Sequence, residues 1–211
     1  MGLWRRYVRP TIVVCVCVYV PLGLLLVAVK QAAPSQHASA LIEPEFDPAV
    51  SLTRGGLWIV GLAGWIWAAS ACCIGVLAAR GRPILDAKRW LLAGAGLLTV
   101  VMLADDLFQL HKPVFPDATG LPSVVLLAVY GLAVVAWAWS NRGAITDTDA
   151  GVLVVALAFF ALWLLAKVGP ENAAKTSIVA GAKLCGIAGW AAYLTLTAWK
   201  TTRARRRVPT S

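Results

Sequence analysis

Residues 57–79 read LWIVGLAGWIWAASACCIGVLAA, an unbroken apolar stretch without a charged side chain. A hydrocarbon core about 30 Å thick is crossed by about 20 apolar residues of α-helix, so this stretch is long enough to span a bilayer. In the whole chain 60% of the residues are hydrophobic and 14% are charged. An ordinary soluble domain carries about 25% charged residues. The composition therefore predicts an integral membrane protein.

Five other stretches are predominantly apolar and about 20 residues long. Strands of outer-membrane barrels are short and alternate between apolar and polar residues, whereas these runs are continuously apolar and favour helices. We therefore expect an all-α, polytopic membrane protein whose residues 1–211 form a single transmembrane helical domain. The six predicted spans cover approximately residues 8–29, 57–79, 90–110, 121–140, 150–168 and 177–199.

Turn-forming residues agree with these boundaries. Arg80-Gly81-Arg82-Pro83 follows the second span, Pro122 stands at the start of the fourth, and Thr148-Asp149 precedes the fifth. Pro21 falls inside the first span, where it is expected to kink the helix. The first span is longer than the core of a signal peptide, so we expect it to remain uncleaved.

Basic residues predict the orientation of the chain. Cytoplasmic loops of membrane proteins carry an excess of Lys and Arg, and interfacial Trp residues mark the ends of the spans. The poorer set of alternate loops holds Lys30, Arg54, Lys112, Lys167 and Lys175. The richer set holds Arg5, Arg6, Arg9, Arg80, Arg82, Lys88, Arg89, Arg142, Lys200, Arg203, Arg205, Arg206 and Arg207, with Trp4, Trp90, Trp139 and Trp199 at the same boundary. Both termini are therefore predicted to be cytoplasmic, in a prokaryotic plasma membrane.

Several function classes receive no support. The net charge of +9 is explained by these topology signals, and no basic, aromatic surface is available for nucleic acid. The five cysteines lie in apolar runs without zinc or disulfide spacing. No nucleotide-binding loop, nucleophile elbow or haem-binding histidine pair occurs, so no cofactor is indicated by motif.

The informative feature is LADDLFQLHK at residues 103–112, at the predicted outer end of the third span. An Asp near the centre of a membrane helix costs about 2.5 to 3.5 kcal/mol, so two adjacent aspartates require compensation. Asp105 and Asp106 are expected to lie roughly 8 Å below His111. Lys183 should lie at a similar depth in the last span. We therefore predict an outward-facing polar pocket between the third, fifth and sixth spans.

Other polar residues are candidates for the same pocket. Lys167 lies near the outer end of the fifth span, followed by Glu171-Asn172. In a continuous helix Asp105 and Gln109 share a face with Lys112, whereas Asp106 points about 100° away. This geometry directs Asp105 towards Lys183 or Lys167, and it leaves Asp106 for His111, water or a cation.

Three interpretations of the pocket remain open. The leading one is binding or transport of a small cation, proton or polar solute by Asp105, Asp106 and Lys183, with Gln109, His111 and Lys167 around them. The second is a structural or accessory membrane subunit whose charges lock the helices together. The third, a membrane-embedded hydrolase or transferase, would use Asp105 and Asp106 as metal ligands.

The third interpretation has a partial precedent. An acid followed by a histidine on one helix resembles the membrane hydrolases that include alkaline ceramidases, which implies zinc held largely by histidines. The chain has two histidines, His37 and His111, so it cannot build a site of three histidines. The sequence therefore leans away from an enzyme.

Two segments outside the spans suggest partners. The tail Arg203-Ala204-Arg205-Arg206-Arg207 is expected to contact anionic lipid of the bilayer, and a membrane-protein partner or homo-oligomer stays open. The loop from Lys30 to Gly56 contains Glu43-Pro44-Glu45-Phe46-Asp47-Pro48 and could act either as a connector or as a lid.

Overall fold

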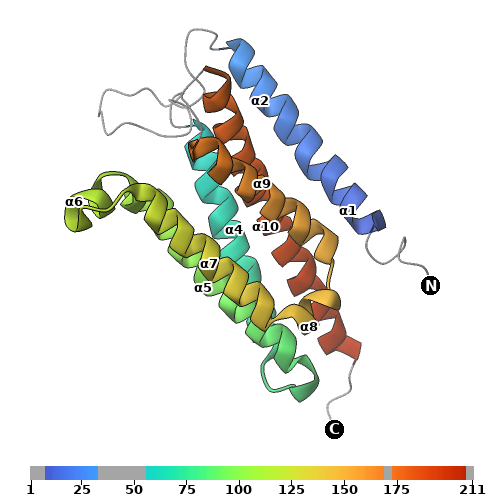
Figure 1. The fold of residues 1–211 in the computed structure, drawn as a ribbon. Coiled ribbons are helices and arrows are strands. Elements are labelled where there is room, and N and C mark those ends of the chain that lie inside the picture. Colours follow the sequence, from blue (N-terminus) through green and yellow to red (C-terminus); the bar gives the residue numbers. More distant parts are fainter. Residues whose placement is uncertain (1–7, 33–55, 169–172, 208–211) are drawn as a thin grey trace. The chain divides into compact units, whose positions relative to one another are not determined.

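The computed structural model describes residues 8–32, 56–168 and 173–207, and every regular element in these ranges is a helix (Figure 1). The all-α fold class is therefore confirmed. The α-helices are α1 (Arg9–Val14), α2 (Val20–Ala32), α4 (Gly56–Ala79), α5 (Asp86–Phe108), α6 (Phe115–Thr119), α7 (Ser123–Ser140), α8 (Arg142–Thr146), α9 (Ala150–Val168) and α10 (Ala173–Arg207). The π-helical segments η2 (Cys15–Tyr19) and η4 (Leu110–Val114) and the 3₁₀ turn η3 (Pro83–Leu85) complete the description.

Three helical stretches are long and apolar enough to cross a membrane. They are Trp58–Ala79, Pro83–Phe108 and Ser123–Ser140, and the described residues also contain two shorter apolar helices, Thr11–Leu24 and Ala150–Ala166. Large apolar side chains stand outward on these helices, among them Ile74, Leu97 and Leu132. Outward-facing apolar side chains are compatible with a lipid surrounding.

Helix boundaries follow the local sequence. Helix α4 ends before Gly81, whose φ of 75° lies in the left-handed region that glycine adopts without strain. Pro122 caps the start of α7 in an extended conformation, and α9 begins directly after Asp149. The helix does not end at Pro21. It changes from the π-helical segment η2 to the α-helix α2 directly before this residue.

The third apolar helix ends in a turn that was not predicted from the sequence. The third apolar helix was expected to continue through Leu110, but α5 ends at Phe108. Gln109 has a φ of 50° and a ψ of 41°, the left-handed conformation that closes helix C-termini. The chain therefore changes direction at Gln109, so residues 105–112 do not form the single continuous helix on which the common face was predicted.

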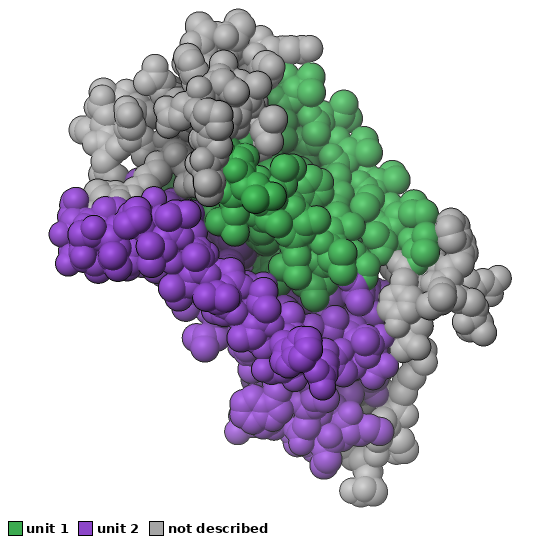
Figure 2. Space-filling model, in the orientation of Figure 1, with its two compact units in different colours: residues 1–64, 151–190 green, residues 65–150, 191–211 purple. Residues whose placement is uncertain are grey.

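The chain divides into two compact units, each assembled from segments distant in sequence (Figure 2). Unit 1 comprises Met1–Gly64 with Gly151–Trp190. In it the ring of Tyr19 lies 5.0 Å from that of Phe159, between centroids. Close approaches there use glycine, since a Cβ at Gly186 would lie 2.8 Å from Phe160.

Unit 2 comprises Trp65–Ala150 with Ala191–Ser211, and it contains the aspartates of the third predicted span. Helices α5 and α7 run antiparallel, because Trp137 Nε1 donates to the Leu91 carbonyl at 3.1 Å while Tyr130 lies near Asp105. Leu91, Leu92 and Ala95 of α5 are fully buried. Helix α5 is therefore central to the packing of this unit.

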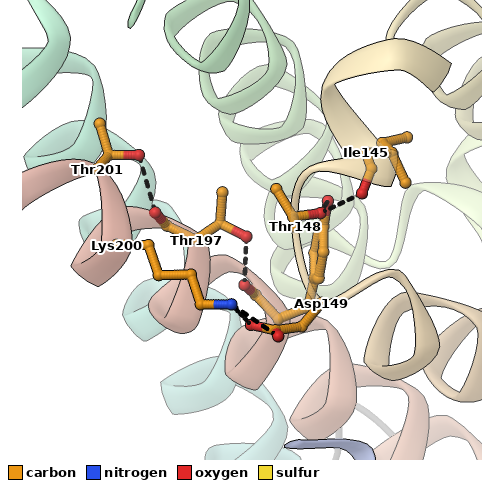
Figure 3. Close-up of polar contacts among 7 residues, drawn as sticks. Ile145, Thr148, Asp149, Thr197, Lys200 and Thr201 are labelled. Carbon is orange, nitrogen blue, oxygen red and sulfur yellow. Dashed lines mark hydrogen bonds and ion pairs between the residues drawn. The ribbon is translucent and has the colours of Figure 1, made fainter. Parts of the chain in front are cut away.

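The buried carboxylate of Asp149 secures the start of α9 within unit 2 (Figure 3). Asp149 is 2% exposed, and both of its carboxylate oxygens lie 2.7 Å from Nζ of Lys200. Beside this pair the hydroxyls of Thr148 and Tyr193 are 3.0 Å apart. From the sequence, Asp149 was interpreted as a helix-start signal and Lys200 as a topology signal. Their ion pair joins the start of α9 to α10.

Packing inside unit 2 predicts the effect of a glycine substitution. A Cβ at Gly75 would lie 2.5 Å from Leu92 Cδ1 and 3.3 Å from the backbone Cα of Ala198, so the neighbours must move apart. We expect Gly75→Val to lower the free energy of unfolding by about 1 to 3 kcal/mol. Unfolding in detergent, followed by circular dichroism, measures this change.

Gly131 of α7 provides the matched control, because a Cβ there would meet nothing within 4 Å. Gly131→Val is expected to leave stability within about 0.5 kcal/mol of the wild type. Equal stabilities of the two variants would show that α4 does not pack closely at Gly75.

Candidate functional site

The candidate site is the carboxylate–histidine cluster, which we define as Asp105, Asp106 and His111. The two aspartates lie in the last turn of α5, and His111 lies in η4. Their exposed fractions are 4% for Asp105, 8% for Asp106 and 3% for His111. Three ionisable side chains are thus buried together inside unit 2, which is rare unless they are paired or bound to an ion.

The turn at Gln109 brings His111 back onto α5. The N–H of Gln109 donates to the Asp105 carbonyl, and η4 follows immediately. The backbone N–H of His111 then donates to Oδ1 of Asp105 at 3.0 Å, and Nδ1 of its ring lies 2.7 Å from Oδ2. One carboxylate therefore fixes both the backbone and the ring of His111.

Two aromatic residues from other helices also contact the cluster. Nε1 of Trp65, in α4, donates to Oδ2 of Asp106 at 2.7 Å. The hydroxyl of Tyr130, in α7, lies 3.4 Å from Oδ1 of Asp105, which is a long hydrogen bond. Neither residue was predicted from the sequence, although a Trp or Tyr inside an apolar helix can place one polar group in a buried position.

The charges of the cluster do not balance among its own members. Two carboxylates face a single imidazole, so the fully ionised cluster has a net charge of minus one. The hydrogen bonds from Trp65 and Tyr130 add dipoles but no positive charge. A cationic group of the protein, a small cation or a proton would offset the remaining charge in this low-dielectric surrounding.

The cluster also has the composition of a metal site. One potential ligand atom from each of Asp105, Asp106 and His111 can be chosen so that all lie within 4.8 Å of one another. Ligand atoms about 2.1 Å from a tetrahedral metal ion lie about 3.4 Å from one another. The three ligand atoms would therefore have to approach one another by up to about 1.4 Å to surround one ion.

The contact of His111 differs from the expected arrangement. The sequence left Asp106 for His111, water or a cation, whereas His111 is buried and its ring contacts Asp105. The physical reason is the left-handed turn at Gln109, which folds η4 over the face of α5 that carries Asp105. Gln109 closes the helix through its backbone and is half-buried.

Among the lysines predicted near the aspartates, the structure describes the side chain of Lys183. Lys183 belongs to unit 1, where its Nζ lies 5.7 Å from the ring centroid of Trp163, within cation–π range. Its pairing with either aspartate stays a prediction. The side chains of Lys167 and Lys112, together with Glu171-Asn172 and the segment Glu43–Pro48, lie outside the described residues.

Comparison with known proteins identifies a family without a described activity. The family model described as Domain of unknown function (DUF8692) matches residues 11–197. No curated protein and no solved structure matches the chain. The function must therefore be inferred from the site itself.

Proposed function

We propose that this chain, which belongs to the family described as Domain of unknown function (DUF8692), is a plasma-membrane protein that binds and passes a small cation or proton at the carboxylate–histidine cluster. The observation that carries the proposal is that Asp105, Asp106 and His111 are all buried and that one potential ligand atom of each lies within 4.8 Å of the other two. Buried ionisable residues in membrane helices commonly mark ion and proton pathways.

We propose six spans for the chain. Each of the six apolar runs coincides with a helix or a helical stretch, and three of these already have sufficient length and apolarity in the described residues. The large apolar side chains on the outer faces support a lipid environment. Leu97 and Leu132, for example, are each 68% exposed.

Three arginine–tryptophan pairs support the orientation with both termini in the cytoplasm. The guanidinium groups lie 4.6 to 5.3 Å from the ring centroids. They occur at the start of α5 and at the ends of α7 and α10. The hydrogen bond from Trp137 to Leu91 and the ion pair between Lys200 and Asp149 bring these helix ends to one end of unit 2 (Figure 1). Such belts are typical of a cytoplasmic interface with anionic lipid. The pairs are Arg89 with Trp90, Arg142 with Trp139 and Arg203 with Trp199.

A structural role is the second candidate, and a specific observation favours it. Trp65 of α4 and Tyr130 of α7 both hydrogen-bond to aspartates of α5, so the cluster connects three helices. If this were its whole function, the charges would lock the helices together and pass nothing. Function and stability must therefore be measured on the same variants.

Ion flux separates the two candidates. We expect liposomes containing the wild type to exchange protons or metal ions faster than protein-free liposomes, as measured with enclosed indicator dyes. Asp106→Asn should reduce the flux to the protein-free rate, because it removes the negative charge. The variant should still fold, because the amide oxygen can accept the hydrogen bond from Trp65.

The control is Asp117→Asn, which makes the same chemical change at an exposed position of α6. This variant should retain the wild-type rate. If Asp106→Asn also retains the wild-type rate, transport through the cluster is excluded and the structural role is favoured.

A further inference from the structure

His111 carries an observation that goes beyond a general cation site. Its ring nitrogen Nε2 is buried, and within the described residues it has no hydrogen-bond partner. Buried polar atoms almost always have one, so an isolated ring nitrogen indicates a missing ligand. The opposite nitrogen, Nδ1, is fully engaged at 2.7 Å from Asp105.

The hydrogen bonds of Asp105 determine which form of the imidazole is present. Whenever the Asp105 carboxylate is ionised it can only accept, and Nδ1 is then the donor in the contact with Oδ2. In the neutral ring, Nε2 then carries a lone pair directed away from Asp105. An imidazole with its Nδ1–H held by a carboxylate and its Nε2 lone pair available is the usual form of a metal-binding histidine.

We propose, resting on the cation site proposed above, that the cation is a divalent transition-metal ion bound by Nε2 of His111 and the carboxylate of Asp106. Asp105 is then a positioning residue, which orients the imidazole through Nδ1 and the His111 backbone. Trp65 orients the Asp106 carboxylate in the same way, through its 2.7 Å hydrogen bond.

The donor set selects the class of metal ion. Imidazole suits Zn²⁺, Fe²⁺, Co²⁺ and Ni²⁺, while carboxylate alone suits Mg²⁺, Ca²⁺ and Mn²⁺. One nitrogen with one or two carboxylate oxygens therefore favours a transition metal over an alkali or alkaline-earth ion. Two protein ligands leave coordination positions for water or for a passing solute, as in sites that exchange their ligands.

Cobalt binding tests the proposal on the purified full-length chain. The protein is stripped with a chelator in detergent and titrated with Co²⁺, whose visible absorption reports ligand field and geometry. We expect one Co²⁺ per chain, displaced by Zn²⁺. His111→Gln should lower Co²⁺ affinity at least a hundredfold, whereas the control His37→Gln, which alters the other histidine of the chain, should bind as the wild type does.

Asp105→Asn tests the positioning role separately. It should weaken Co²⁺ binding about 10- to 100-fold and shift the absorption spectrum, as expected when the partner of a metal-binding histidine is changed. Asp106→Asn, expected to preserve the fold, should lose the bound ion as His111→Gln does. Circular dichroism verifies that each variant retains its helices.

The outcomes distinguish this inference from the proposed function. Absence of Co²⁺ from the wild type, or wild-type affinity in His111→Gln, overturns the metal proposal. If the infrared spectrum of that metal-free wild type nevertheless shows a protonated carboxyl group that Asp106→Asn lacks, the site binds a proton and the proposed function stands. If neither metal nor proton is bound, both proposals fail.

Discussion

Asp105→Ala is expected to lower the free energy of unfolding by about 3 to 5 kcal/mol, because it breaks a buried pair and leaves one partner behind. Asp105 accepts hydrogen bonds from the ring and backbone of His111 and contacts Tyr130. Without it, Nδ1 and the backbone N–H of the buried residue His111 would both lose their partner. Unfolding with increasing SDS in mixed micelles, followed by Trp fluorescence, measures the loss.

Two further variants serve as controls for Asp105→Ala. Asp117→Ala removes an exposed carboxylate and should change stability by less than about 0.5 kcal/mol. Asp105→Leu/His111→Leu replaces both buried partners with apolar side chains, so it should recover most of the stability lost by Asp105→Ala. A loss no greater than that of Asp117→Ala would contradict the buried pair.

The second large effect concerns the bound cation. A cation that binds the folded chain at a hundred times its dissociation constant should stabilise the wild type by about 2.7 kcal/mol. In Asp106→Asn this gain should disappear, while unfolding without added cation stays within about 1 kcal/mol of the wild type, because Trp65 keeps an acceptor. Melting curves in a series of chloride salts, from Na⁺ to Zn²⁺, measure both quantities.

Asp117→Asn serves as the control for nonspecific salt effects. It should be stabilised by the same cation to the same extent as the wild type, because its carboxylate is exposed in α6. If every salt acts equally on the wild type and on Asp106→Asn, then no cation other than a proton binds at the cluster.

The helices could be predicted from the sequence because long apolar runs can be recognised from composition alone. In a bilayer every backbone N–H and C=O must be satisfied within its own segment, so a long apolar run has one structural solution. Gly81 and Pro122 also marked boundaries correctly, since positive φ and a missing N–H constrain the chain locally.

The end of α5 could not be predicted from Gln109 itself. Glutamine has no special preference for the left-handed conformation, unlike glycine or asparagine, so a continuous helix was the natural expectation. A weaker cue was present in Pro113, which cannot donate a hydrogen bond to the carbonyl of Gln109 in a continuing α-helix. The turn at Gln109 determines that the His111 ring contacts Asp105.

The partners of the cluster depend on contacts between helices. Asp105, Asp106 and His111 were predicted as candidates from their cost in an apolar segment. Trp65 and Tyr130 lie far away in sequence, and only the packing of α4 and α7 on α5 brings them to the aspartates. A hydropathy pattern indicates how deep in the membrane a residue lies, but it does not indicate how neighbouring helices are rotated about their axes.

The most direct test of the cation site is the infrared difference spectrum of the carboxyl groups, recorded on the wild type and on Asp106→Asn, with and without chelator. One measurement reports both possible cations, because a protonated carboxyl group and a metal-bound carboxylate absorb at different frequencies. We predict a protonated or metal-shifted carboxyl band in the wild type that is absent from Asp106→Asn. A wild-type spectrum showing only free, ionised carboxylates would contradict the account and leave the cluster as a structural connection between helices.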